Sequence, residues 1–374
     1  MIWHHCLKLT YKYVILHFKE KHMKSIQSTS CQVHFQENAY TQLNNYLAIS
    51  KHSLIFVLVD ENTERDCLPK LLSEMATEVT IEIIEIESGE INKNLETCTG
   101  LWNVLTELGA DRKSLMINLG GGVITDMGGF IASTFKRGIT FINIPTTLLS
   151  MVDASVGGKT GVDLGVLKNQ IGIFSDPQMV LIDTEYLNTV TPEEMISGTA
   201  EIIKHGLIYD RDLFNDVRNN NLDNVEYLIH RSVEIKNEVV LKDQKESSLR
   251  KILNYGHTIG HAVESYFLES DHKKTLTHGQ AISLGMVTEA YVSNKLFGFP
   301  EETLTDLKAY VIDLFGKVPV VTDDYSAIFD YLKHDKKNVG GQVNFVLLED
   351  IENFKIDCKV DIALVEESIN YYLA

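Results

Sequence analysis

Runs of β-branched and other apolar residues alternate with amphipathic stretches through the first half of the chain. Short apolar runs rich in Val and Ile predict β-strands, whereas apolar residues spaced three and four apart predict helices. The predicted strands are residues 53–59, 79–86, 114–118, 139–144 and 179–183. The predicted helices between them are residues 64–75, 94–108 and 124–135. This alternation predicts a parallel sheet covered by helices on both faces.

The pattern changes near residue 190, where strands give way to long amphipathic segments. Residues 191–194, Thr-Pro-Glu-Glu, supply an N-cap, a helix-starting proline and first-turn acids. Further helices are predicted near residues 192–206, 222–241, 247–267 and 277–296, then a short strand at 342–348 and a C-terminal helix. We therefore predict an α/β domain with a parallel sheet over residues 23–190 and a mostly α-helical domain over residues 191–374.

Residues 1–22 fit neither domain. Their aromatic and apolar stretches are interrupted by five charged residues, Lys8, Lys12, Lys19, Glu20 and Lys21. This is too much charge for a membrane span, and the segment lacks a small-residue cleavage site. We predict an extension outside the fold, with Met23 as a candidate start. A short amphipathic surface helix is the alternative interpretation.

Composition narrows the classes of function. Of 374 residues, 34 are Lys or Arg and 52 are Asp or Glu, which gives a formal net charge of -18. This charge disfavours a broad nucleic-acid surface, because affinity for the phosphate backbone depends on clustered Lys and Arg. Any anionic ligand must be bound by local cations. The five cysteines are scattered without a C-x-x-C pair, which argues against a disulfide framework and favours a reducing cytoplasm.

Three segments of the first half carry candidate dinucleotide chemistry. The turn from Leu119 to Asp126, LGGGVITD, follows a predicted strand and opens a predicted helix, where backbone N–H groups favour a pyrophosphate. The strict G-x-G-x-x-G spacing fails, since Thr125 takes the third glycine position. Residues 88–93 and 145–147 follow two other strands at the same sheet edge. A tight structural turn and ordinary helix caps remain the alternatives.

The glycine-rich run DASVGGKTGVDLGVLKNQIG, residues 153–172, ends its first part like a P-loop. Asp153, however, stands where that motif requires its first glycine, and a carboxylate there would repel a nucleotide phosphate. A nucleotide-triphosphate site is therefore disfavoured. The run still places Lys159 and Lys168 nine residues apart, and either lysine alone is compatible with a solvated surface charge.

Candidate metal ligands lie in the helical half. Glu201, His257 and His278 form a carboxylate and two-imidazole set that suits a divalent metal such as Zn²⁺ and leaves positions open for substrate. His257 and His261 are one helical turn apart, as in H-E-x-x-H proteases, but Thr258 stands where the protease motif has its catalytic Glu. A packing or hydrogen-bonding role for the histidines remains open.

Seven runs together resemble one known family. They are GGGVITDMGGF, KRG, IPTTLLSMVDASVGGKTGVDLGVLKNQIG, AEIIKHG, RKILNYGHTIGHAVE, HGQAI and HDKKNVGGQVNFVLL. In this order they are similar to the 3-dehydroquinate synthases of the shikimate pathway, over residues 25–370. Other sugar phosphate cyclases share much of the pattern.

The resemblance implies a Rossmann-like NAD⁺-binding domain, a helical metal- and substrate-binding domain, and a cleft between them. It also implies a lyase that converts 3-deoxy-D-arabino-heptulosonate 7-phosphate to 3-dehydroquinate and phosphate by transient oxidation, elimination, reduction and aldol closure. The implied cofactors are NAD⁺ and a divalent metal, Zn²⁺ or alternatively Co²⁺, held by Glu201, His257 and His278.

The resemblance also assigns the remaining site residues. Catalytic positions match His261 (a candidate proton relay), Lys204, Asp153, Lys159, Lys236, Arg250 and Asn254. Substrate-binding positions match Lys168, Asn169, Arg137 and one of Lys336 and Lys337. Arg137 is expected to reach the neighbouring subunit's site, which implies a homodimer in the cytoplasm. Partners other than the small sugar phosphate, including nucleic acid and membrane, are not expected.

NAD⁺-binding positions match a further set of residues. They are Ser88, Gly89, Glu90, Lys93, Gly121, Gly122, Val123, Ile124, Thr125, Asp126, Thr146, Thr147, Lys159, Lys168, Tyr186, Leu187, Asn188 and Thr189. The sequence departs from the family's common pattern at Thr125, where many members have glycine, and in the stretch from Tyr186 to Thr189.

Three alternatives stay open at this point. An NAD- and metal-dependent polyol dehydrogenase would accumulate NADH and would not need phosphate-directed cations. A related cyclase would form another carbocycle, although one set of residues favours a carboxylate-bearing substrate, namely Lys236, Arg250, Asn254 and His261. A catalytically silent binding protein is disfavoured, because none of the three candidate metal ligands is lost.

Overall fold

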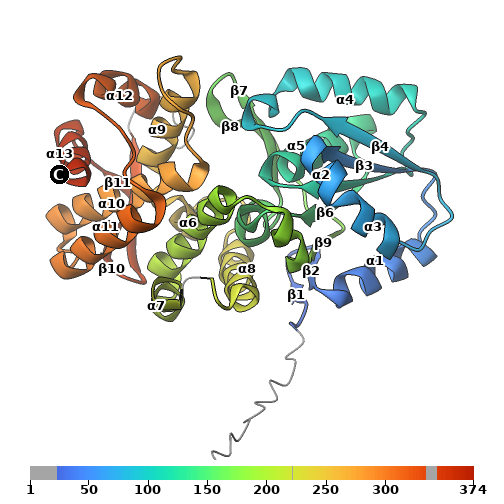
Figure 1. Cartoon of the computed structure of the whole chain (residues 1–374), viewed down its shortest axis with the longest axis horizontal. Helices are drawn as coiled ribbons and strands as arrows, with labels where there is room; N and C mark the ends of the chain where they lie inside the picture. The colour runs from blue at the N-terminus through green and yellow to red at the C-terminus, as the bar shows by residue number, and fades with distance from the viewer. Residues whose placement is uncertain (1–22, 221, 334–342) are drawn as a thin grey trace, which may run out of the picture.

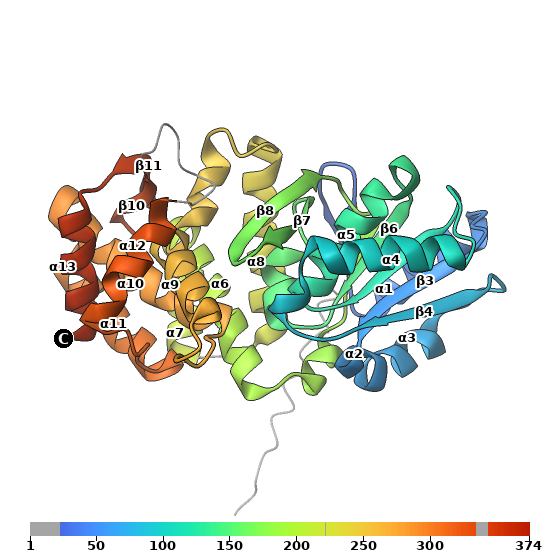
Figure 2. The same cartoon turned by 90° about the horizontal axis from the view of Figure 1, so that it is seen from above.

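We describe the fold from a computed structural model in which residues 23–220, 222–333 and 343–374 are described. An α/β half and a helical half lie side by side (Figure 1). Between them lies a hairpin of β7 (Lys159–Leu164) and β8 (Leu167–Phe174), which Figure 2 shows from above. The predicted extension and the candidate lysines Lys336 and Lys337 lie outside the described residues.

Seven strands form the sheet of the α/β half. In order across the sheet they are β1 (Ile26–Gln27), β2 (Gln32–Phe35), β9 (Met179–Ile182), β6 (Thr140–Pro145), β5 (Leu115–Gly120), β3 (Ile55–Asp60) and β4 (Ile81–Ile86). β1 pairs with β2 in antiparallel fashion, and the other pairings are parallel. The predicted parallel sheet is confirmed.

Helices cover both faces of this sheet, as the unbroken apolar run of β3 shows. Ile55, Val57 and Val59 enter one core together with side chains of α1 and α3. Phe56 and Leu58 enter a second core with α4 and α5. Neighbouring residues of a strand point to opposite faces, so each core needs its own helices. They are α1 (Glu37–Ile49), α2 (Glu61–Asp66), α3 (Leu68–Glu74), α4 (Leu95–Glu107) and α5 (Gly122–Thr134).

The prediction of one helix over residues 64–75 is wrong. The chain forms α2 and α3 instead, which meet at Cys67. Helix α2 begins three residues early because the Asp60 side chain accepts hydrogen bonds from the backbone N–H groups of Asn62 and Thr63. Strands β1 and β2 and helix α1 were not predicted, since their short or weakly patterned segments give little periodic signal.

The glycine-rich run of residues 153–172 forms a π-helical turn and then the β7–β8 hairpin, an element that the sequence did not predict. Gly161 and Gly172 face each other across the two strands. A Cβ on Gly161 would lie 2.5 Å from the Ile171 carbonyl oxygen, so the strands can approach only without side chains here.

The helical half contains eight α-helices and one hairpin among its described residues. They are α6 (Pro192–Tyr209), α7 (Arg211–Asn220), α8 (Val225–Lys242), α9 (His257–Glu269), α10 (His278–Phe297), α11 (Glu301–Phe315), α12 (Tyr325–Lys333), β10 (Asn344–Asp350), β11 (Asn353–Lys359) and α13 (Ile362–Leu373). Together with the sheet they confirm the predicted fold class. The division into two domains at residue 190 stays a prediction.

The prediction of one continuous helix over residues 247–267 is also wrong. A 3-10 turn, Leu249–Asn254, precedes α9, and Gly256 between them has a φ of 77°. This left-handed conformation ends one helical segment and starts the next in a new direction. Across the part of the chain that the structure describes, we find no helix with the length and apolar character to cross a membrane.

Helices α9 and α10 pack with their backbones in contact. A Cβ on Gly285 of α10 would lie 1.8 Å from the Gly256 carbonyl oxygen and 2.9 Å from the Gly260 nitrogen. Because the obstructing atoms belong to backbone, they cannot rotate away. This contact sets the distance between the start of α9 and the middle of α10.

We predict that Gly285→Ala lowers the free energy of unfolding by about 3 kcal/mol, because the new methyl group must separate α9 from α10. The matched control is Gly100→Ala on α4, where a Cβ meets nothing within 4 Å. The control should raise stability by about 0.5–1 kcal/mol through helix propensity. Urea unfolding measures both variants, and equal stability of the two would contradict the packing described.

Candidate active site

A cavity between the two halves is lined by all seven predicted catalytic residues and by part of the predicted cofactor and metal sets. The α/β half contributes, among others, Glu90, Lys93, Gly122, Asp126, Asp153, Lys159, Lys168 and Asn169. The helical half contributes, among others, Lys204, Lys236, Arg250, Asn254, His257, His261, Glu264 and His278. Segments more than 180 residues apart in sequence therefore meet around one space.

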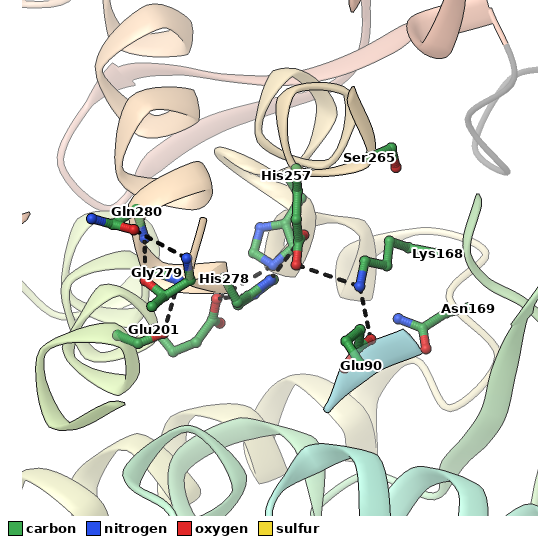
Figure 3. Close-up of polar contacts among 12 residues, drawn as sticks. Glu90, Lys168, Asn169, Glu201, His257, Ser265, His278, Gly279 and Gln280 are labelled. Carbon is green, nitrogen blue, oxygen red and sulfur yellow. Dashed lines mark hydrogen bonds and ion pairs between the residues drawn. The ribbon is translucent and has the colours of Figure 1, made fainter. Parts of the chain in front are cut away.

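The three candidate metal ligands come from three helices that converge on one point (Figure 3). Glu201 lies in α6, while His257 and His278 are the first residues of α9 and α10. The Glu201 Oε1 atom lies 3.4 Å from His257 Nε2 and 3.5 Å from His278 Nε2. Each residue offers one ligand atom, and these atoms all lie within 4.8 Å of one another.

The second ring nitrogen of each histidine, Nδ1, contacts a protein oxygen on the side away from Glu201. His257 Nδ1 donates to the Tyr255 carbonyl oxygen at 3.0 Å, and His278 Nδ1 faces the Glu264 carboxylate at 3.3 Å. Metal-binding histidines are commonly fixed by such contacts. Because the proton of His257 is on Nδ1, the Nε2 atom presents a lone pair to the Glu201 carboxylate oxygen. Two such acceptors repel each other unless a cation lies between them.

Burial and neighbouring charge set the protonation of this centre. Burial lowers the pKa of His257. Burial also works to lower the pKa of His278, but the carboxylates of Glu264 and Glu201 outweigh it and raise the pKa to about 10. The two histidines differ because only His278 has a second carboxylate. Lys204 and His257 outweigh burial at Glu201 and hold its pKa well below the usual range.

The residues fit a divalent metal on structural grounds. Glu201 is 1% exposed, and its Oε1 atom accepts no hydrogen bond from any described residue. Leaving a buried carboxylate oxygen without a partner costs free energy. One oxygen and two nitrogen donors form the ligand set typical of Zn²⁺ sites that keep a position open.

A second group of charges surrounds Asp153, which the π-helical turn before β7 carries into the cavity. Its Oδ1 atom lies 2.9 Å from Lys236 Nζ, 3.8 Å from Lys204 Nζ and 3.6 Å from His205 Nε2. Burial works to raise the pKa of Asp153, but the Lys204 and Lys236 ammonium groups outweigh it and hold the pKa well below the usual range. Lys204 also pairs with Glu201.

The loop before α9 carries Arg250 and contacts Lys159. Arg250 is 1% exposed and donates to the carbonyl oxygens of Gln244 and Gly157, each at 2.8 Å. Glu246, which the sequence analysis missed, accepts from Asn254 Nδ2 at 2.7 Å and pairs with Lys159. The Glu246 carboxylate thus contacts Asn254 and Lys159, two residues that the sequence analysis predicted to contact substrate.

The cofactor candidates form a third cluster, next to the hairpin. Lys93 Nζ lies 2.7 Å from Asp126 Oδ2 and 2.8 Å from Asn169 Oδ1, and Lys168 Nζ lies 2.9 Å from Glu90 Oε1. Burial works to lower the pKa of Lys93, but Asp126 and Glu90 outweigh it and raise the pKa. Asp126 at the end of the glycine turn, the segment 88–93 and the hairpin are therefore brought together by the fold.

Other predicted cofactor residues lie away from these charges. The Ser88 hydroxyl donates to Glu61, Thr147 pairs with Ser150, and Thr125 is buried with its hydroxyl bonded to carbonyl oxygens inside α5. The stretch Thr184–Thr189 forms a 3-10 turn after β9. These cofactor roles, like the catalytic and substrate roles, stay predictions.

Arg137, the predicted contact to a second subunit, is exposed at the turn after α5. Its φ of 73° places it in the left-handed region. Its role between subunits also stays a prediction.

Two further carboxylates escaped the sequence analysis. Glu264 follows His257 and His261 at helical spacing on α9, a periodicity that could have revealed it. Glu289 of α10 is buried and accepts from the N–H groups of Gly256 and Thr258 at 2.7 and 3.1 Å. It thereby caps the start of α9 and fixes His257, although nothing local in the sequence indicates this long-range contact.

Solved structures of similar fold include two carbocycle synthases and a dehydrogenase. A 2-deoxy-scyllo-inosose synthase in complex with carbaglucose-6-phosphate, NAD⁺ and Co²⁺ is 24% identical, with a TM-score of 0.79 over 93% of this chain and 100% of that chain. The 2-epi-5-epi-valiolone synthase of Streptomyces hygroscopicus, with NAD⁺ and Zn²⁺ bound, is 24% identical, with a TM-score of 0.81 over 94% and 98%. A butanol dehydrogenase of Thermotoga maritima reaches a TM-score of 0.63 at 14% identity. The fold alone therefore defines a class of proteins that includes these two synthases and a dehydrogenase.

Family models narrow this class. Residues 83–197 match the model of the 3-dehydroquinate synthase N-terminal region, and residues 198–338 match that of the C-terminal region. A 3-dehydroquinate synthase of Parabacteroides distasonis is 41% identical over 338 residues, 89% of this chain and 95% of the relative. One of Methylacidiphilum infernorum is 40% identical over 300 residues, 79% and 82%. The chain belongs to the 3-dehydroquinate synthase family, which confirms the predicted family and its enzyme class, a carbon–oxygen lyase.

The loop that carries Arg250 yields a pH prediction. Asp243 accepts hydrogen bonds from the backbone N–H groups of Ser247, Ser248 and Arg250. Although burial opposes them, these bonds lower the pKa of Asp243 from 3.8 to about 2. The pKa is lower in the folded state, so the carboxylate stabilises the fold above about pH 4, and this stabilisation is lost as the pH falls through about 2.

We predict that Asp243→Asn lowers the free energy of unfolding by about 2 kcal/mol at pH 7, and that its difference from the parent shrinks towards pH 2. Urea unfolding between pH 7 and pH 3 measures the difference. The control is Asp271→Asn in an exposed turn, which should change little. A difference for Asp243→Asn that does not vary with pH would contradict the assignment.

Proposed function

We propose that the protein converts 3-deoxy-D-arabino-heptulosonate 7-phosphate to 3-dehydroquinate and phosphate. The observation that carries the proposal is the meeting of the Glu201, His257 and His278 centre, whose two histidines line the cavity, with buried cations from both halves. Family membership supports the same reaction. NAD⁺ and a divalent metal, when bound, supply reversible hydride acceptance and a Lewis acid for the substrate hydroxyls.

Glu201, His257 and His278 are the residues that would hold the metal, and Zn²⁺ is the first candidate, with Co²⁺ as the alternative. Two solved cyclases of the same fold are described with NAD⁺ and one of these ions. Glu90, Lys93 and Asp126 would hold NAD⁺ beside the glycine turn, where the start of α5 offers backbone N–H groups to a pyrophosphate.

The buried cations bind the anionic ends of the substrate in this proposal. Lys236 is 6% exposed and Arg250 is 1% exposed, and each needs a negative partner to offset the loss of hydration. The carboxylate of Glu246 contacts Lys159 and Asn254 in this structure. A phosphate or carboxylate of the substrate would replace it at these two side chains. A dehydrogenase of neutral polyols has no use for this many cations.

Proton transfers fall to groups beside the metal centre. His261 lies one turn after His257, with its ring centre 5.1 Å from that of His257 and 5.9 Å from that of His278. This places an imidazole next to the candidate ligands, within reach of a proton on the substrate, as a proton relay requires. Asp153, held by Lys236 and Lys204, orients these ammonium groups toward the reacting part of the cavity.

The homodimer with Arg137 at the partner's site and the cytoplasmic location also belong to this proposal. Arg137 is exposed on a turn at the surface of the α/β half, as a contact to a second subunit requires. Both statements derive from the family resemblance and the composition.

We predict phosphate release and 3-dehydroquinate formation in equal amounts when the protein receives the heptulosonate phosphate with catalytic NAD⁺ and Zn²⁺. NADH should not accumulate, because each turnover returns the hydride. Phosphate is measured colorimetrically, 3-dehydroquinate by chromatography and NADH by absorbance. Stoichiometric NADH would favour a dehydrogenase, and a different carbocycle would favour a related cyclase; either result would refute the proposal.

We predict that His257→Ala removes bound metal and activity together, whereas Lys159→Ala retains the metal and raises KM for the phosphorylated substrate at least about tenfold. Metal analysis of the purified variants and steady-state kinetics separate the two effects. Lys242→Ala, an exposed lysine that contacts Tyr209 on the outside of α8, is the control and should match the parent. Full metal content in His257→Ala would overturn the ligand assignment.

A further inference from the structure

Glu264 of α9 lies between the metal centre and the cofactor cluster. Its Oε2 atom lies 3.3 Å from His278 Nδ1, and its Oε1 atom lies 3.6 Å from Lys168 Nζ. The residue is 9% exposed, so the contacts form in a nearly dry environment. The two oxygens of one buried carboxylate thus serve two different clusters.

On the other side, Lys168 continues the connection into the α/β half. Its Nζ atom lies 2.9 Å from Glu90 Oε1, a contact drawn in Figure 3, and 3.6 Å from Asp163 Oδ2. Lys168 is 8% exposed and sits in β8 of the hairpin. An unbroken series of charged groups therefore runs from a candidate metal ligand to a candidate cofactor residue.

The residue next to Glu264 ties the same two elements together through the backbone. The Ser265 hydroxyl donates to the Val166 carbonyl oxygen at 2.9 Å, at the turn between β7 and β8. Helix α9 thus meets the hairpin at two adjacent positions, one ionic and one not. This difference allows docking of the hairpin to be separated experimentally from the effect of the carboxylate.

We propose that Glu264 is a positioning residue that couples the binding of the divalent metal to the binding of NAD⁺. A ligated metal fixes the His278 ring and thereby Glu264. Glu264 then holds Lys168, and Lys168 holds Glu90 in place for the cofactor. A site ordered in advance binds its ligand more tightly, so each ligand should strengthen the binding of the other by the same factor. The inference rests on the proposed function for the identity of the two ligands.

The experiment measures, on the full-length protein, the affinity for each ligand in the absence and in the presence of the other. The dissociation constant of NAD⁺ is measured by calorimetry with and without Zn²⁺, and that of Zn²⁺ by chelator competition with and without NAD⁺. In the parent protein we expect each ligand to tighten the other by about fivefold or more. Glu264→Gln keeps the size of the side chain but has one acceptor oxygen instead of two, so it cannot serve both His278 and Lys168.

In Glu264→Gln we expect the coupling factor to fall to within twofold of one, and Zn²⁺ affinity to fall about tenfold. Glu264→Asp is the second variant, because it keeps the charge but is too short for both contacts; it should lose the coupling as well. Ser265→Ala removes only the neutral contact and should keep the coupling. Glu269→Gln is the control for loss of a carboxylate elsewhere on α9, because Glu269 lies at the end of the helix and contacts Tyr331.

A coupling factor of one in the parent protein would overturn the inference, as would unchanged coupling in both Glu264 variants. Loss of coupling in Ser265→Ala to the same extent as in Glu264→Gln would assign the effect to hairpin docking and would also overturn it. These are binding measurements with NAD⁺ and Zn²⁺ alone. A protein that shows the coupling but forms no 3-dehydroquinate would refute the proposed reaction and leave this inference standing.

Discussion

Charge that is buried between the two halves must be paired, and this requirement dictates the arrangement of the whole cavity. An ionised carboxylate or ammonium group away from water costs several kcal/mol unless oppositely charged or hydrogen-bonding groups surround it. Asp153 and Glu264 meet ammonium groups of other elements, and Glu201 meets Lys204 of its own helix and the histidines of α9 and α10. Because the partners come from helices, a π-helical turn and a hairpin that are distant in sequence, the pairing holds these elements in register.

The same requirement reconciles an acidic chain with an anionic substrate. The formal net charge of -18 describes the total and not the distribution. Lys204, Lys236 and Arg250 are almost fully buried in one place, where each is matched by a carboxylate or a carbonyl oxygen. Screening by salt is weak at such depth. A small cationic pocket can therefore act on one phosphate while the surface remains strongly negative.

The sequence predicted those features whose cause is local. Apolar runs such as residues 53–59 form strands because burial on both faces selects continuous hydrophobicity. The glycine turn before α5 is equally local. The β7–β8 hairpin was not predictable, because its glycines at 161 and 172 erase the period-two signal while permitting close strands. The break at Gly256 was missed because apolar periodicity continues past it. Gly256 is stabilised there by Glu289, which is 33 residues away.

The candidate site divides in the same way. Glu201, His257 and His278 could be found because ligand chemistry restricts the residue types. Residue type alone did not indicate Glu246 or Glu264, since a surface helix also carries many glutamates, and only Glu264 has a helical spacing to the histidines that could have revealed it. Their importance comes from burial and from which cation they meet, and both depend on the packing of α9 against the hairpin and on the turn that positions Arg250.

The dipole of α10, which begins at His278, acts on the carboxylates beside this residue. The peptide groups of this 20-residue helix sum to a partial positive charge at its first turn, where the capping groups, Thr277 and Gln280, are neutral. Glu201 and Glu264 contact His278 and so lie at this positive end. The helix thus stabilises the negative charge of these two carboxylates beside the candidate metal ligands. The backbone therefore contributes, together with the lysine side chains, to the burial of two carboxylates at one point.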